Sequence, residues 1–180
     1  MGLDTSFVRT SRNAYEIYKK NLDDSGYAVV DKYISIRMDD VAYFRKFWSL
    51  LDRLNYTDDN YGKYVEVPKE KIEELRDEAK DTILMVEMFV KENGWELEHS
   101  FLDRVNIDGD YLKIIGECIS LKNGVFTNSF EDKCDKICSE VYERSDTSLF
   151  KKVVTLYQKF SDILDQTDFE KELILHESNW

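Results

Sequence analysis

The part of the chain that says most about its architecture spans residues 39–90 and reads DDVAYFRKFWSLLDRLNYTDDNYGKYVEVPKEKIEELRDEAKDTILMVEMFV. Two segments with apolar residues at helical spacing flank a polar loop at 57–62 and a short alternating segment at 63–67. A spacing of three to four residues places apolar side chains on one face of a helix, whereas alternation is typical of a strand. The stretch therefore predicts a helix, a strand and a second helix whose apolar faces the rest of the chain covers.

The first of these helices is expected to begin near residue 40. Asp39 or Asp40 is suited to the N-cap, where a carboxylate accepts hydrogen bonds from free backbone N–H groups. An apolar stripe follows, made of Val41, Phe44, Phe47, Trp48, Leu51 and Leu54.

The second helix is expected over residues 69–92. Pro68 is suited to the start of a helix because its fixed φ matches the helical value. Asn93 and Gly94 form a common helix stop. The apolar face between them consists of Ile72, Leu75, Ala79, Ile83, Val86 and Val90.

The remaining chain gives weaker patterns. We expect an extended segment or short strand at 1–8, a helix at 11–22, one strand or two at 27–37, and helices at 128–144 and 146–164. Residues 95–121 are ambiguous, and the tail from 168 contains a short apolar run at 173–175. The fold class predicted is α+β: one mostly helical domain over residues 1–180 with a small antiparallel or mixed sheet. Residues 1–94 form its better-defined α+β half and residues 95–180 its mainly helical half.

The chain is strongly acidic, with a net charge of −12 over 180 residues. Residues 1–90 carry 18 acidic and 14 basic side chains, and residues 91–180 carry 19 and 11. Such a balance opposes general binding to nucleic acid or to an anionic membrane, and it permits binding to a basic protein surface. Three cysteines and the lack of a long apolar run favour a reducing cytoplasm, which the phage resemblance described below places in a bacterial host cell.

Several residue groups are candidates for metal or catalytic sites. Cys134 and Cys138 share a face of a predicted helix, but that face is apolar, so buried core thiols are favoured. His99 and His176 belong to no recognisable motif, and surface or structural roles are favoured for them. A calcium-loop template fits four residues but requires glycine where Tyr111 stands, so a solvated turn is favoured. The sequence therefore predicts no metal and no cofactor; the four template residues are Asn106, Asp108, Asp110 and Glu117.

The N-terminal half is locally basic and rich in tyrosine, and that combination can hold RNA by charge and stacking. The favoured alternative is that these residues form ordinary solvated helix faces. The residues concerned are Arg9, Arg12, Lys19, Lys20, Arg37, Arg45, Lys46 and Arg53, with Tyr15, Tyr18, Tyr33 and Tyr43.

Three segments carry a family resemblance: MGLD at 1–4, VAYFRK at 41–46, and the 63–67 strand that leads into the helix after Pro68. Over roughly residues 1–80 the chain resembles a group of small phage-encoded proteins that begin MGLD. The sequence departs from that group at Thr5-Ser6-Phe7, where Met-Tyr-Leu is common, and in its more acidic second half. The resemblance implies a phage or prophage accessory protein and assigns no activity. The matching polar residues are Asp4, Arg45, Lys46 and Tyr64.

By size and charge the chain is also similar to anti-CRISPR proteins, many of which present carboxylates to the basic channel of a nuclease. The leading hypothesis is an anti-defence protein that binds a bacterial RNA-guided nuclease such as Cas9, and reaches RNA only through that partner. The carboxylates expected to bind the partner are Glu131, Asp132, Asp135, Glu140 and Glu143.

Two alternatives remain open. The first is a small ribonuclease that acts on guide RNA, with Arg45 and Lys46 as phosphate clamps and Asp4 or a tyrosine such as Tyr64 in the chemistry. The second is a phage structural or regulatory protein that catalyses no reaction. Whether the protein is an enzyme, and its oligomeric state, stay undecided at this point.

Overall fold

The computed structural model describes residues 4–20, 38–45, 48–54, 63–92, 94, 96–97, 99–103 and 146–179. These residues form an α+β fold, as expected from the sequence. The elements in chain order are β1 (Asp4–Ser11), α1 (Arg12–Lys20), β2 (Asp39–Arg45), α2 (Trp48–Arg53), β3 (Val65–Val67), α3 (Lys69–Glu92), α7 (Asp146–Gln166) and β4 (Glu172–Asn179).

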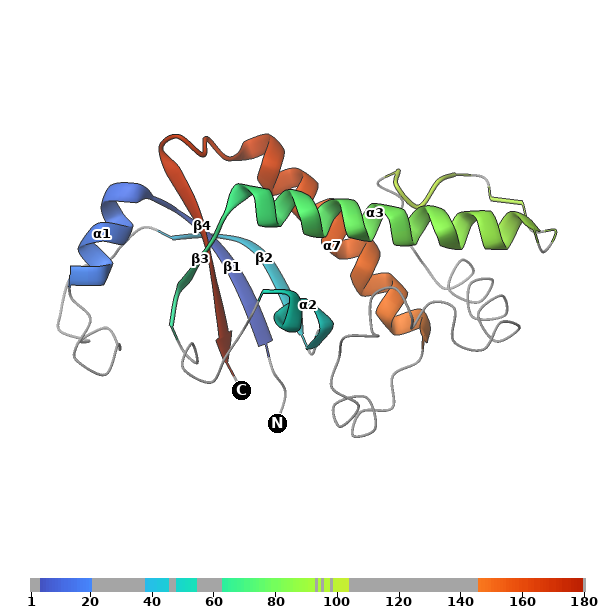
Figure 1. Cartoon of the computed structure of the whole chain (residues 1–180), viewed down its shortest axis with the longest axis horizontal. Coiled ribbons are helices and arrows are strands. Elements are labelled where there is room, and N and C mark those ends of the chain that lie inside the picture. The colour runs from blue at the N-terminus through green and yellow to red at the C-terminus, as the bar shows by residue number, and fades with distance from the viewer. Residues whose placement is uncertain are drawn as a thin grey trace.

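The four described strands form one antiparallel sheet in the order β2-β1-β4-β3. The first and last strands of the chain are the two central ones. They pair along their whole length, from Asp4 opposite Asn179 to Ser11 opposite Glu172. This pairing brings the two ends of the chain close together at one end of the sheet (Figure 1).

Helices α3 and α7 cover one face of the sheet and pack along each other beyond it (Figure 1). The main core lies between them and the strands. Phe7 of β1 is fully buried at its centre, with its ring 5.9 Å from that of Phe44 and 5.1 Å from that of Phe160, both in edge-to-face geometry. The α3 residues of this core are the six apolar residues that the sequence pattern placed on one face.

A smaller apolar cluster lies on the other face of the sheet, under α1. Val8, Leu173 and Leu175 of the central strands pack there against Tyr15 of α1. Both faces of β1 and β4 are therefore covered where α1 packs on the sheet.

The prediction of a helix from residue 41 is wrong for the first half of that segment. Asp39–Arg45 is strand β2, and the helix α2 covers only Trp48–Arg53. Ala42 and Phe44 are buried while Tyr43 and Arg45 are exposed, which is the two-residue period of a strand. The sequence is ambiguous because Val41, Phe44 and Leu51 also fit helical spacing, and pairing with β1 decides the outcome.

Other expectations are confirmed. Helix α3 begins and ends where predicted, and Gly94 beyond it has a φ of +83°. The described residues also bear out the strand before Pro68 and the helices after Ser11 and from Asp146.

Strand β4 was not predicted. Its residues 173–176 are all buried, so they lack the alternation that marks a half-exposed strand. The expected strand at 27–37, the helix at 128–144, both of its cysteines and the calcium-like loop lie outside the described residues. Within the described part of the chain, every helix is too short or too polar to cross a lipid bilayer.

Candidate functional site

The sheet face opposite α3 and α7 is the place where the residues singled out from the sequence meet. We call it the open sheet face. Strand alternation and cross-strand pairing assign residues to it, because Ser6 lies opposite both Tyr43 and Glu177, and Asp4 lies opposite Arg45. Its polar residues are Asp4, Ser6, Asp40, Tyr43, Arg45, Tyr64, Glu66 and Glu177.

Asp4, Tyr43 and Arg45 form a cluster at the outer end of this face. The Nε atom of Arg45 lies 3.8 Å from the Oδ1 atom of Asp4, and the two side chains are 70% and 37% exposed. Tyr43 is a largely exposed aromatic residue, and its hydrogen bond to Asp4 raises the pKa of its hydroxyl. The cluster is therefore accessible to a partner from solvent.

Tyr64 lies at the opposite side of the same face, next to β4. It immediately precedes β3, and its backbone oxygen accepts a hydrogen bond from the Tyr15 hydroxyl at 3.4 Å. The ring of Tyr18 packs edge-on against it, with centroids 5.7 Å apart. Burial, followed by the charge of Glu177 and a hydrogen bond to it, raises the pKa of Tyr64 to about 12.

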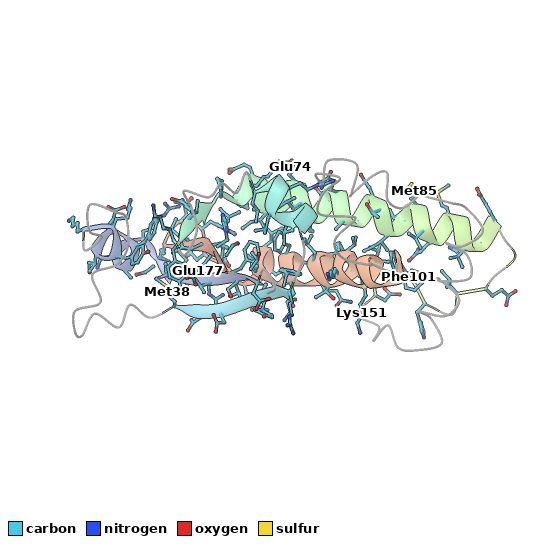
Figure 2. All side chains as sticks on the ribbon, turned by 90° about the horizontal axis from the view of Figure 1, so that it is seen from below. Met38, Glu74, Met85, Phe101, Lys151 and Glu177 are labelled. Carbon is cyan, nitrogen blue, oxygen red and sulfur yellow. The ribbon has the colours of Figure 1, made fainter. Side chains whose placement is uncertain are left out.

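A single cross-strand row joins these two groups. It runs from Tyr43 on β2 through Ser6 on β1 to Glu177 on β4. The pairing of Val65 with His176 places Tyr64 next to Glu177, so the row ends there. In Figure 2, Glu177 lies toward the α1 end of the molecule, away from Phe101 and Lys151 along its long axis.

Carboxylates dominate the charge of the open sheet face. Asp4, Asp40, Glu66 and Glu177 project from its strands, against the guanidinium of Arg45. Asp40 and Glu66 are exposed. Such a face attracts cationic groups and repels phosphates at short range.

The structure thus brings together three of the four catalytic candidates, Asp4, Arg45 and Tyr64, on one face of the sheet. Asp4 and Arg45 are direct neighbours, whereas Tyr64 reaches the face from beyond β4. Lys46 lies outside the described residues. So do the five carboxylates expected to bind a partner: Glu131, Asp132, Asp135, Glu140 and Glu143.

Comparison with protein-family models, with curated proteins and with solved structures found no match to this chain. The geometry of the open sheet face and the charge of the chain therefore carry the functional argument.

Five polar residues of the face were not among the catalytic or partner-binding candidates from the sequence, although Tyr43 belonged to the tyrosine-rich group that can hold RNA; they are Ser6, Asp40, Tyr43, Glu66 and Glu177. Tyr43 stands out once the alternation of Ala42 and Phe44 with Tyr43 and Arg45 is read as a strand. Nothing in the sequence indicates a site role for Glu177, because it follows a run of buried residues that lacks the alternation typical of a strand.

The arrangement favours binding over tyrosine chemistry. The raised pKa values of Tyr43 and Tyr64 keep both hydroxyls protonated near neutral pH, so they donate hydrogen bonds and are poor bases or nucleophiles. A tyrosine and an arginine exposed side by side on a flat surface are typical of residues that contribute most to protein–protein binding. Within the described residues, no group of three or more histidine, cysteine or acidic side chains is arranged to hold a metal ion.

Proposed function

We propose that this protein is a phage or prophage anti-defence protein that binds a basic surface of an RNA-guided bacterial nuclease such as Cas9. The observation that carries the proposal is the open sheet face, on which carboxylates surround an exposed tyrosine and arginine. The nucleic-acid channel of such a nuclease is lined with positive charge, so the two surfaces are complementary. The choice of partner rests on the net charge of −12 and on the resemblance to MGLD phage proteins.

The role of each group in the proposed complex follows from its exposure. Tyr43 and Arg45 supply the contact area and the hydrogen bonds at the centre of the interface. Asp40 and Glu66 supply charge toward its edges, where they increase the association rate more than the final affinity. The association is therefore expected to be fast and to weaken with salt.

The test is cleavage of target DNA by a guide-loaded Cas9 in the presence of this protein, with the guide RNA resolved beside it on a denaturing gel. Blocked cleavage with an intact guide is the expected result. Tyr43→Ala is expected to raise the inhibitory concentration at least about tenfold. Asp40→Lys tests the charge of the face, and Asp81→Lys on the exposed side of α3 makes the same change away from it.

Three outcomes decide against this function. Inhibition that is unchanged at high salt excludes recognition through charge. Equal loss of inhibition in Asp40→Lys and Asp81→Lys excludes the open sheet face as the binding surface. Cleavage that proceeds at its normal rate with saturating protein excludes Cas9 as the partner.

A second function is favoured by the contact between Asp4 and Arg45. A carboxylate beside a guanidinium, both exposed, can act on a phosphodiester if the guanidinium holds the phosphate and the carboxylate moves a proton. This arrangement supports an enzyme that cleaves guide RNA. Blocked DNA cleavage with a shortened guide, abolished by Asp4→Asn, is the result that this second function predicts.

A further inference from the structure

A cavity of about 290 Å³ lies on the side of the sheet away from the open sheet face, where β3 turns into α3. Four elements build its wall: the end of α2, strand β3, the start of α3 and the central strand β4. Its volume falls near the lower end of the range for small-molecule sites. The lining residues are Leu54, Glu66, Val67, Pro68, Lys71 and His176.

His176 is the unusual member of this wall. It lies in the middle of β4 and is 2% exposed, and its Nδ1 atom has no hydrogen-bond partner. A buried polar nitrogen without a partner destabilises the folded state. The neighbouring Ser178, two residues along the same face, is paired with Thr5 at 3.2 Å. An unpaired imidazole at the wall of a cavity therefore marks a position where a ligand can supply the missing bond.

The first turn of α3 faces the same cavity through Pro68 and Lys71. The backbone N–H groups of Lys71 and Ile72 donate to the Pro68 oxygen at 3.0 and 3.2 Å, so those of Lys69 and Glu70 have no acceptor within the helix. The positive end of the dipole of this 24-residue helix adds to their field. Free N–H groups at a helix start are suited to an anion.

Lys71 supplies a full positive charge at the cavity. Its Nζ atom lies 2.8 Å from the Oε1 atom of Glu74, in a pair whose carboxylate is 60% exposed. Partly exposed pairs of this kind contribute little to stability, so Lys71 can turn toward a ligand at small cost. Glu66 opposes an anion, but it is exposed, and alternation along β3 directs it to the open sheet face, away from Val67.

We propose that this cavity binds the phosphate group of a small molecule, held by the first turn of α3, by Lys71 and by His176. Burial keeps His176 neutral, so it offers one N–H donor to a phosphate oxygen. Leu54 and Val67 provide apolar surface for the remainder of the ligand. Of the lining residues, Glu66 alone also belongs to the open sheet face, and the site does not depend on the function proposed for that face.

The test is a titration of the whole protein with inorganic phosphate, followed by the imidazole resonances in long-range ¹H–¹⁵N spectra. The chain has two histidines, and His99→Gln assigns the remaining signal to His176. A saturable shift of the His176 signal is expected, with no shift from chloride at equal ionic strength. Glycerol phosphate in place of inorganic phosphate shows whether the apolar wall adds affinity.

Matched variants locate the binding site. Lys71→Gln is expected to weaken phosphate binding about tenfold, as the loss of one charge-assisted hydrogen bond does. Lys69→Gln removes the same charge from the same turn and keeps the backbone N–H. The Lys69 side chain pairs with Glu73 and does not line the cavity, so less than a threefold effect is expected (about 0.6 kcal/mol).

Two results would overturn the proposal. One is a His176 signal that stays unmoved at saturating phosphate. The other is equal weakening by Lys71→Gln and Lys69→Gln, which would assign the shift to general charge. Neither result bears on nuclease inhibition, which is measured separately.

Discussion

Arg53 at the end of α2 and Glu78 in the middle of α3 form a two-point ion pair. The Nε atom of Arg53 donates to Oε2 at 2.7 Å, and Nη2 donates to Oε1 at 3.2 Å. The Arg53 side chain is 5% exposed, whereas that of Glu78 is 34% exposed. This pair fixes the short helix α2, which is too short to be stable alone, against the long one.

Glu78→Gln is expected to lower the free energy of unfolding by about 2 kcal/mol, because it leaves a buried guanidinium without its counter-charge. The estimate is below the full value for a buried pair since Glu78 is partly exposed. Urea unfolding followed by circular dichroism measures the change.

Glu73→Gln is the matched control for this variant. It makes the same chemical change on the same helix, but the Glu73–Lys69 pair is exposed on both sides, with 41% and 48% of the side chains accessible. A loss below about 0.5 kcal/mol is expected for it. Equal losses in the two variants would show that Arg53 does not need Glu78 as its partner.

The two strands β2 and β4 show what the sequence pattern determines and what it does not. The core face of α3 follows from periodicity alone, because one face is buried and the other is solvated over six turns. Residues 41–45 fit both a helix and a strand, and pairing with β1 selects the strand. Residues 173–176 are buried on both faces of the sheet, so no period distinguishes them.

The sequence identified individual residues of the candidate site but not their arrangement. Asp4, Arg45 and Tyr64 come from three separate segments, and nothing in their spacing indicates that they share a face. The register of β1 with β2 and β4 brings them together. Glu177 and His176 became interpretable only with the strand that contains them, because sequence patterns carry no information on long-range pairing.

Glu87 of α3 holds the segment that follows the helix. Its Oε1 atom accepts a hydrogen bond from the Ser100 hydroxyl and another from the Phe101 backbone N–H, each at 2.6 Å. The Phe101 ring then packs edge-on against Phe150 of α7, with centroids 5.3 Å apart. A single carboxylate thereby connects α3, the segment and α7.

Glu87→Ala is expected to lower the free energy of unfolding by about 2 kcal/mol, since it removes the acceptor of the Phe101 N–H and of the Ser100 hydroxyl. Hydrogen exchange of the Phe101 amide should accelerate in the same variant. Glu87→Gln keeps the acceptor oxygen and should recover part of both effects. An unchanged exchange rate at Phe101 in Glu87→Ala would contradict the role assigned to this carboxylate.

Gly94 ends α3 with a φ of +83°, and its N–H donates to the Lys91 oxygen at 3.0 Å. No atom lies within 4 Å of the position that a Cβ would take, so the cost of a side chain comes from the backbone alone. Gly94→Ala is expected to lower the free energy of unfolding by about 1 kcal/mol. Gly94→Asn should cost less, because asparagine tolerates positive φ. Thermal unfolding of both variants measures the difference, and an equal loss in the two would exclude the backbone explanation.

The last prediction concerns the pH dependence of stability that His176 imposes. Burial lowers the pKa of its imidazole from 6.5 to about 4. Between these two values the unfolded chain binds a proton that the folded chain does not, so the free energy of unfolding falls as the pH is lowered through this window. Above it the full stability is present, and below it no further loss arises from this residue.

This difference between the folded and unfolded pKa corresponds to about 3 kcal/mol of stability. Between pH 7 and pH 4, the free energy of unfolding of the natural chain should therefore fall by about 3 kcal/mol more than that of His176→Gln. Comparing the two slopes removes the contribution of carboxylates, which titrate in both proteins. His99→Gln serves as the control because it makes the same substitution at an exposed histidine. Parallel pH profiles for His176→Gln and the natural chain would mean that the imidazole gains a proton without unfolding, and hence that water reaches its nitrogen through the adjacent cavity.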